Sequence, residues 1–156
     1  MRKTSKFILI SLILIIFYGC GYSVLDKSLN YKIIDISLEG EKKINYNIKN
    51  KLLFYNGEDN DNKLNLRITT SKKKIIKNKS VKNEITSYQI EISTTVSYKL
   101  IGDIKENNFT ISQSGDYKVS SNRVISLNSE KRLIETLTNN IIEKISQKLN
   151  NIINDN

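Results

Sequence analysis

Residues 90–100 read IEISTTVSYKL, and this stretch indicates the fold class more clearly than any other part of the sequence. The even-numbered positions are mainly apolar, with Ile90, Ile92, Val96, Tyr98 and Leu100. The odd-numbered positions between them carry polar side chains. Successive side chains of a strand point to opposite faces of a sheet. The alternation therefore predicts a strand with one face on a core and the other in water.

Weaker alternating patterns on both sides predict three more strands. They cover residues 31–38, residues from 64 onward, and residues 109–119. Gly115 interrupts the last of these patterns, and we expect it to mark a bulge or an early turn.

Two segments repeat apolar residues every three or four positions, which is the pattern of an amphipathic helix. The first covers residues 44–55 and is stopped by Asn56 and Gly57. The second begins at Ser129 as N-cap, with Glu130 in its first turn. Its apolar stripe consists of Leu133, Leu137, Ile141, Ile145, Leu149 and Ile152.

The expected order is strand, helix, three strands, helix. Each helix has one apolar stripe and each strand one apolar face, so the simplest arrangement is a two-layer α+β sandwich. We expect two helices packed on a mainly antiparallel four-stranded sheet, forming a single domain over residues 31–156. Ile92, Val96, Leu137 and Ile141 should be buried between the two layers.

Composition excludes several kinds of chemistry. The 156 residues include no histidine and one cysteine, which leaves no Cys/His zinc site, no Ser-His pair and no internal disulfide. We expect no catalytic residue, no metal and no cofactor. The net charge of +9 comes from 21 lysines and 4 arginines, a bias typical of an AT-rich genome, so only a local lysine cluster indicates a partner.

The N-terminus has the layout of a secretory signal peptide. Basic residues at positions 2, 3 and 6 precede an apolar run over residues 7–18, and the run ends at Gly19 and Cys20. Twelve helical residues span about 18 Å, well short of the ~30 Å hydrocarbon core of a bilayer, so a membrane-spanning helix is the poorer interpretation.

Cys20 follows a small residue at the end of the apolar run, as in a bacterial lipobox, although Phe17 and Tyr18 are bulkier than is usual there. We therefore expect a lipoprotein signal peptide over 1–19, lipid attachment at Cys20 and a lipidated tether over 20–30. Several acyl chains on one residue suit stable anchoring. The alternative is an ordinary signal peptidase site that leaves a free thiol.

Six lysines cluster within residues 72–82, in the expected connection between the second and third strands. Ile75 and Ile76 lie among the charges, a mixture suited to a phosphorylated, acylated lipid surface. We expect Lys72, Lys73, Lys74 and Lys77 to lie nearest the phosphates of lipopolysaccharide. The alternative is a solvated hairpin in a lysine-rich protein. We expect no nucleic acid partner, because an exported protein seldom meets one.

Two short motifs resemble the LPS-assembly lipoproteins of the LptE type, in particular their alphaproteobacterial branch. Residues 19–22 read GCGY and are similar to the family's GCGF start. Residues 117–122 and Ser126 resemble the "sYn…S.yA" approach to the C-terminal helix, although Leu127 and Asn128 stand where the family prefers Tyr and Ala.

The resemblance implies a non-enzymatic role on the periplasmic side of the outer membrane. Lipoproteins of this type plug the LptD β-barrel, support its assembly and assist lipopolysaccharide transport to the cell surface. Gly21 agrees with an outer-membrane location, because lipoproteins that are retained in the inner membrane generally have Asp at that position. Two other hypotheses are an accessory lipoprotein of another envelope lipid-transport system and a hydrolase that uses carboxylates alone.

Overall fold

The computed structural model describes residues 31–54, 56 and 62–155. Its elements follow one another as β1 (Lys32–Gly40), α2 (Lys42–Phe54), β2 (Lys63–Lys79), β3 (Ile85–Leu100), β4 (Asn107–Lys118) and α3 (Arg123–Asn154). This is the order that the sequence pattern predicts. The expected signal peptide, tether and Cys20 lie outside the described residues.

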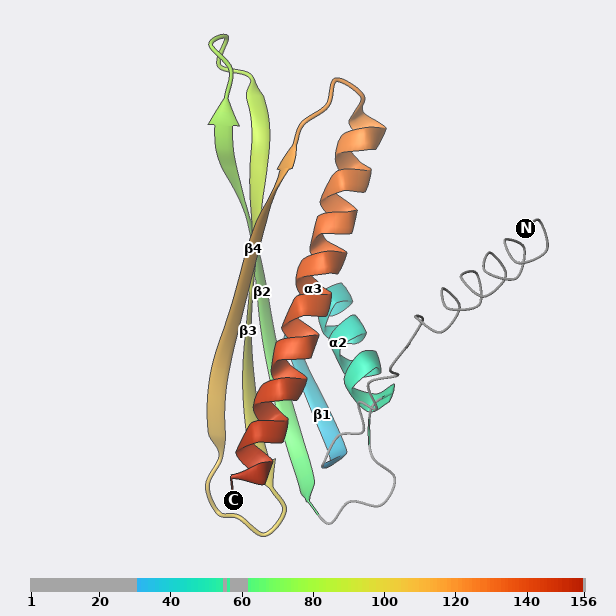
Figure 1. The fold of residues 1–156 in the computed structure, drawn as a ribbon, viewed down its shortest axis with the longest axis vertical. Coiled ribbons are helices and arrows are strands. Elements are labelled where there is room, and N and C mark those ends of the chain that lie inside the picture. The colour runs from blue at the N-terminus through green and yellow to red at the C-terminus, as the bar shows by residue number, and fades with distance from the viewer. Residues whose placement is uncertain (1–30, 55, 57–61, 156) are drawn as a thin grey trace, which may run out of the picture.

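The strands form one sheet in the order β1-β2-β3-β4. β1 runs parallel to β2, while β2 and β3, and β3 and β4, are antiparallel. Both helices cover the same face, with α2 over β1 and α3 over β4 (Figure 1). The predicted α+β sandwich with two helices on a mainly antiparallel four-stranded sheet is therefore confirmed.

The core lies between the sheet and the helices and follows the predicted periodicities. Ile92, Val96, Leu137 and Ile141 are all buried, as expected. Four consecutive members of the α3 stripe, at steps of four residues, are at most 4% exposed, and Leu133 and Ile152 at its ends are partly buried. The opposite face of the sheet is lined by hydroxyl groups, with Thr95 bonded to Thr110 and Ser112 to Ser93.

One prediction was wrong at the lysine-rich segment, which is not a connection. β2 continues through it to Lys79, in register with β3, so that Lys72 pairs with Ile92 and Lys74 with Ile90. Only residues 80–84 form the turn, where Asn83 has φ 63° and its N–H donates to the Ser80 carbonyl. The ladder with β3 pairs the backbone groups of this segment that point toward β3, and lysine is well tolerated on the other, free edge because its charged head stays in water.

Two smaller expectations were also wrong. α3 begins at Arg123 rather than near Ser129, because the Asn122 side chain accepts a hydrogen bond from the Val124 N–H and caps the helix. Gly115 lies in an uninterrupted β3–β4 register rather than at a bulge or turn. A Cβ there would lie 2.7 Å from Leu133 Cδ1, so glycine allows α3 to approach β4 closely.

The molecule divides along its long axis into two regions. The base consists of residues 31–54, 62–70, 94–112 and 137–155 and includes β1 and α2. The arm consists of residues 71–93, 113–118 and 123–136, where α3 alone faces three strands (Figure 1). The hairpin tip and the first turns of α3 lie at the same end of the molecule, far from its C-terminus.

Candidate functional site

The four lysines expected to bind phosphate lie together on the arm but on opposite faces of β2. Lys72 and Lys74 pair in register with the buried residues Ile92 and Ile90, so they lie on the face that carries the helices. Lys73 lies on the other face, because side chains alternate. Lys77 forms an ion pair with Asp116 of β4. The β3–β4 register places Asp116 on that other face as well. The lysines therefore do not form a single pocket.

Three of these lysines already have carboxylate partners. Lys72 Nζ lies 3.7 Å from Glu41 Oε2, at the start of α2. Lys77 forms an ion pair with Asp116, and both of these side chains are well exposed. Lys74 pairs with Glu130 of α3. The remaining lysine, Lys73, has no ion-pair partner among the described residues and is exposed.

Lys74 is the centre of a small polar network between β2, β4 and α3. Its Nζ lies 2.6 Å from Glu130 Oε2, and the Tyr117 hydroxyl donates to the same oxygen at 2.7 Å. The ammonium also lies 4.4 Å from the centroid of the Tyr88 ring, which stacks on Tyr117 at 5.7 Å between centroids. A cation–π contact and two charge-assisted hydrogen bonds therefore converge here.

The network lowers the pKa of one of its members and raises the pKa values of the other two. Burial alone would raise the pKa of Glu130, but its hydrogen bonds with Lys74 and Tyr117 outweigh burial and lower it. Burial alone would lower the pKa of Lys74, but the pairing of Lys74 with Glu130 outweighs burial and raises this pKa. Burial, together with the bond to Glu130, raises the pKa of Tyr117. At neutral pH the network therefore holds a carboxylate, an ammonium and a neutral phenol.

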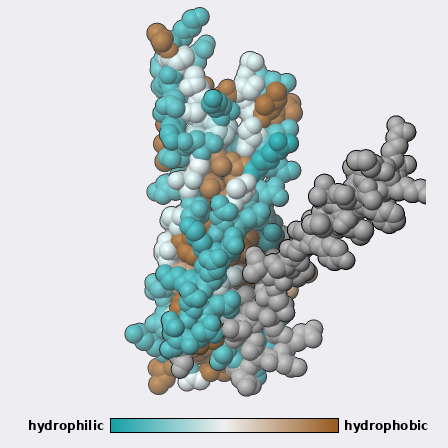
Figure 2. Space-filling model, viewed as in Figure 1, coloured by the Kyte–Doolittle hydropathy of each residue, from teal (hydrophilic) through white to brown (hydrophobic). Residues whose placement is uncertain are grey.

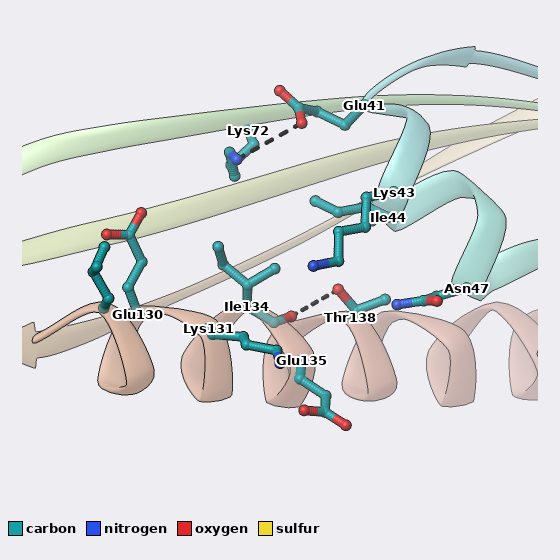
Figure 3. A pocket seen from close by; sticks show the side chains of 11 residues that line it. Glu41, Lys43, Ile44, Asn47, Lys72, Glu130, Lys131, Ile134, Glu135 and Thr138 are labelled. Atoms are coloured by element: carbon teal, nitrogen blue, oxygen red, sulfur yellow. Dashed lines mark hydrogen bonds and ion pairs between the residues drawn. The ribbon is translucent and has the colours of Figure 1, made fainter. Parts of the chain in front are cut away.

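A pocket of about 540 Å³ lies beside this network, between the start of α2, β2 and α3. Figure 3 shows Lys72 and Glu41 on one side of it and Glu130, Ile134 and Thr138 along α3. Its lining combines apolar side chains with three cations and three carboxylates, and consists of Glu41, Lys43, Ile44, Asn47, Lys72, Leu127, Glu130, Lys131, Ile134, Glu135 and Thr138. The balanced charges make it a pocket for a partly polar group rather than a pure anion site.

Exposed apolar side chains accompany the lysines on the arm. Ile75, Ile76 and Val81 of the hairpin are 44%, 47% and 107% exposed, and the first turns of α3 expose Val124, Ile125 and Leu127. Figure 2 shows hydrophobic surface at the hairpin tip and near the start of α3. Cations and apolar groups thus share one end of the molecule, which is the combination that an anionic amphiphile requires.

The sequence indicated the lysines but not their partners. Glu41, Asp116 and Tyr117 carried no prediction of an ionic contact, and Glu130 was expected only to favour the start of α3. Lys74 and Glu130 are 56 residues apart, and they meet because α3 packs on the sheet. Within the described residues, no helix is long and apolar enough to cross a bilayer.

Comparisons with known proteins bear on the fold. No family model and no curated protein matches the chain. Among solved structures, rare lipoprotein B from Shewanella oneidensis has a TM-score of 0.61 at 14% identity, over 78% of this chain and 97% of that one. Lipoprotein B from Nitrosomonas europaea has a TM-score of 0.58 at 8% identity, over 87% and 93%. The chain has the fold of these lipoproteins.

Proposed function

We propose that this protein is an envelope lipoprotein of the LptE type, anchored in the outer membrane through Cys20 and facing the periplasm. One observation carries the proposal, namely that the chain shares the fold of rare lipoprotein B over most of its length. The signal-peptide pattern that ends at Cys20 supports the lipid anchor. In this role the protein is not an enzyme. It plugs an LptD-type β-barrel, supports assembly of the barrel and contacts lipopolysaccharide during transport.

The arm supports the lipopolysaccharide contact. Lipid A carries phosphates beside acyl chains, and the arm presents lysines beside exposed Ile75, Ile76 and Val81. Because Lys72 and Lys74 lie on the helix side while Lys73 and Lys77 lie on the opposite face, the two pairs contact different groups of the lipid. Each exposed lysine near an anionic lipid surface contributes about 1 kcal/mol.

The anchor is tested by fractionating cells that express the wild type or Cys20→Ala. The wild type should remain with outer membranes, and mass analysis of the purified protein should show loss of residues 1–19 and added acyl mass. Cys20→Ala should leave the membrane fraction without a change in thermal unfolding, because Cys20 lies outside the described domain. An intact N-terminus or an unmodified Cys20 thiol on the mature protein contradicts the anchor.

The barrel partner is tested by purifying the tagged, membrane-extracted protein and identifying what co-purifies. We expect an LptD-type β-barrel in near-equal amount. Co-purification of an inner-membrane lipid transporter instead would favour the accessory lipoprotein of another transport system. Cys20→Ala serves as a control, since it separates partners bound by the domain from proteins that only share the membrane.

The lipid contact is tested with lipopolysaccharide and four variants of the full domain. The quadruple change of Lys72, Lys73, Lys74 and Lys77 to Gln should weaken binding at least tenfold at low salt, and each pair alone should weaken it less. A charge-matched control changes four exposed base lysines to Gln, namely Lys42, Lys51, Lys63 and Lys99. The effect should shrink as salt rises, because charges are screened beyond about 8 Å at physiological ionic strength. Equal loss in both quadruple variants would show a dependence on net charge only.

A further inference from the structure

The edge of β2 becomes free where β1 leaves the sheet. β1 pairs with β2 up to Gly40 and Thr70, and the Glu41 N–H then donates to the Thr70 carbonyl at 3.0 Å. Gly40 has φ +90°, and a Cβ there would lie 2.0 Å from the Thr70 carbonyl oxygen, so the chain can turn away sharply into α2. β2 continues for nine more residues, to Lys79, beside no other described strand on that edge.

The backbone groups that point out of this edge can be identified. The carbonyls of Asn62 and Thr70 accept from residues 32 and 41, on the β1 side, whereas the Lys63 carbonyl accepts from Ile101, at the β3 end. In a strand, N–H and C=O of one residue point the same way, and neighbouring residues alternate. The N–H and C=O of Lys72 and Lys74 therefore point outward, and no described backbone group pairs with them.

The free edge borders the pocket described above. Glu41 and Lys72, which line the pocket, stand where β1 ends and the free edge of β2 begins (Figure 3). α3 forms the far wall with Leu127, Glu130 and Ile134. A strand added in line with β1 would turn every second side chain toward this pocket and the others toward the opposite face of the sheet, near Lys73.

We propose that the free edge of β2 accepts an extended acidic segment of a partner protein as an added strand in line with β1. Strand addition satisfies the outward groups of Lys72 and Lys74, and alternate side chains supply specificity. Apolar side chains of the segment pack on the apolar part of the pocket, beside Ile44, Leu127 and Ile134. Acidic side chains of the segment contact Lys73 of β2, and the 17 residues of β2 include no Asp or Glu that would repel them. This inference does not depend on the proposed lipopolysaccharide role.

Hydrogen exchange on the wild-type domain tests the proposal, with a capped peptide that alternates glutamate and valine as the probe. In the free protein the Lys72 and Lys74 N–H groups should exchange faster than those of Ser71 and Lys73, which point toward β3. The peptide should protect Lys72 and Lys74 selectively. A control peptide with lysine in place of glutamate should not. If about 1 mM peptide protects neither N–H group, the Kd is weaker than about 1 mM. That result overturns the proposal.

A matched pair of variants separates the backbone from the side chain. Lys72→Pro removes the outward N–H and leaves the β3 ladder intact, while Lys72→Gln removes only the charge. We expect Lys72→Pro to weaken peptide binding more than tenfold and Lys72→Gln less than threefold. Equal effects contradict strand addition. Protection of Lys72 and Lys74 that rises with protein concentration without peptide would assign the edge to a second copy of the chain and overturn the proposal.

Discussion

The base and the arm are stabilised by different kinds of contact. Among the described residues, the buried apolar side chains belong mostly to the base, and only Ile90, Ile92 and Tyr117 belong to the arm. The arm instead contains the Lys74–Glu130–Tyr117 network and the stacked Tyr88 and Tyr117 rings. The base therefore supplies most of the folding free energy, and the arm is held by a few specific contacts that a partner can supplement.

The difference follows from how many layers cover the sheet. In the base, β1 widens the sheet and α2 packs beside α3, so apolar groups can be enclosed from several sides. In the arm only α3 faces the sheet, and the lysine stems of β2 take the places that apolar side chains have in the base. Partly buried charges then require partners, which Glu41 and Glu130 provide.

The largest expected effect lies in the base. Ile141 is fully buried, and Ile141→Ala should destabilise the domain by about 2 to 5 kcal/mol, since the change leaves a cavity between α3 and the sheet. Leu127 lies on the same helix in the arm and is 54% exposed, so Leu127→Ala should cost less than about 0.5 kcal/mol. Chemical denaturation measures both, and similar losses would remove the distinction between the regions.

Gly40 marks the boundary between the regions, and its substitution should have the next largest effect. The positive φ and the clash of a new Cβ with the Thr70 carbonyl should make Gly40→Ala destabilising by about 2 to 3 kcal/mol. Gly102 also has a positive φ but open space around its Cβ position, so Gly102→Ala should cost less. Equal losses in denaturation would mean that backbone strain alone matters and that the close approach to Thr70 does not.

Much of the base was predictable, because there burial follows simple periodicities. In the base, the alternation in β3 and the stripe of α3 correspond to the buried residues, from Val96 to Leu149. The arm was less predictable for the same reason. Its β2 segment lacks an alternating apolar pattern, and the first turns of α3 carry no stripe because they are exposed, so both looked like connections in the sequence.

The candidate site could be found only in part. A run of lysines is visible in the sequence, but its distribution over two faces depends on the strand that the run forms. Lys77 and Asp116 are 39 residues apart and meet across β3, which no local pattern indicates. The sequence therefore shows which residues are charged, while the sheet register and the packing of the helices decide which charges pair with one another.

In the arm, the largest electrostatic effect should come from Glu130. Glu130→Gln should destabilise the domain by about 1 kcal/mol at neutral pH, because Lys74 loses its ion pair while the Tyr117 hydroxyl keeps an acceptor. Much of the Coulomb attraction is screened, since the Lys74 side chain is 38% exposed. Thermal and chemical denaturation measure the change, with Glu135→Gln as a control on the same helix.

The sign of the pH dependence follows from the direction of each shift. The lowered pKa of Glu130 means that its stabilisation is present above the ordinary value of 4.5 and is lost as pH falls through the lowered pKa. The raised pKa values of Lys74 and Tyr117 mean that their stabilisation is lost as pH rises above about 10. The difference between wild type and Glu130→Gln should therefore be greatest between these limits. A difference independent of pH contradicts the role of this network.

The smallest expected effect concerns Lys77 and Asp116, the ion pair on the opposite face of the arm. The two side chains are 44% and 40% exposed, so water screens their attraction and ordering them costs side-chain entropy. Lys77→Gln should change the free energy of unfolding by less than about 0.5 kcal/mol, and the change should vanish at high salt.

Lys74→Gln, on the helix side of the same strand, should cost more and keep part of its effect at high salt, because its contact with the Tyr88 ring is also lost. Denaturation at low and high salt compares the two. A larger loss from Lys77→Gln would mean that the arm is stabilised mainly on its outer face and that the network with α3 contributes little.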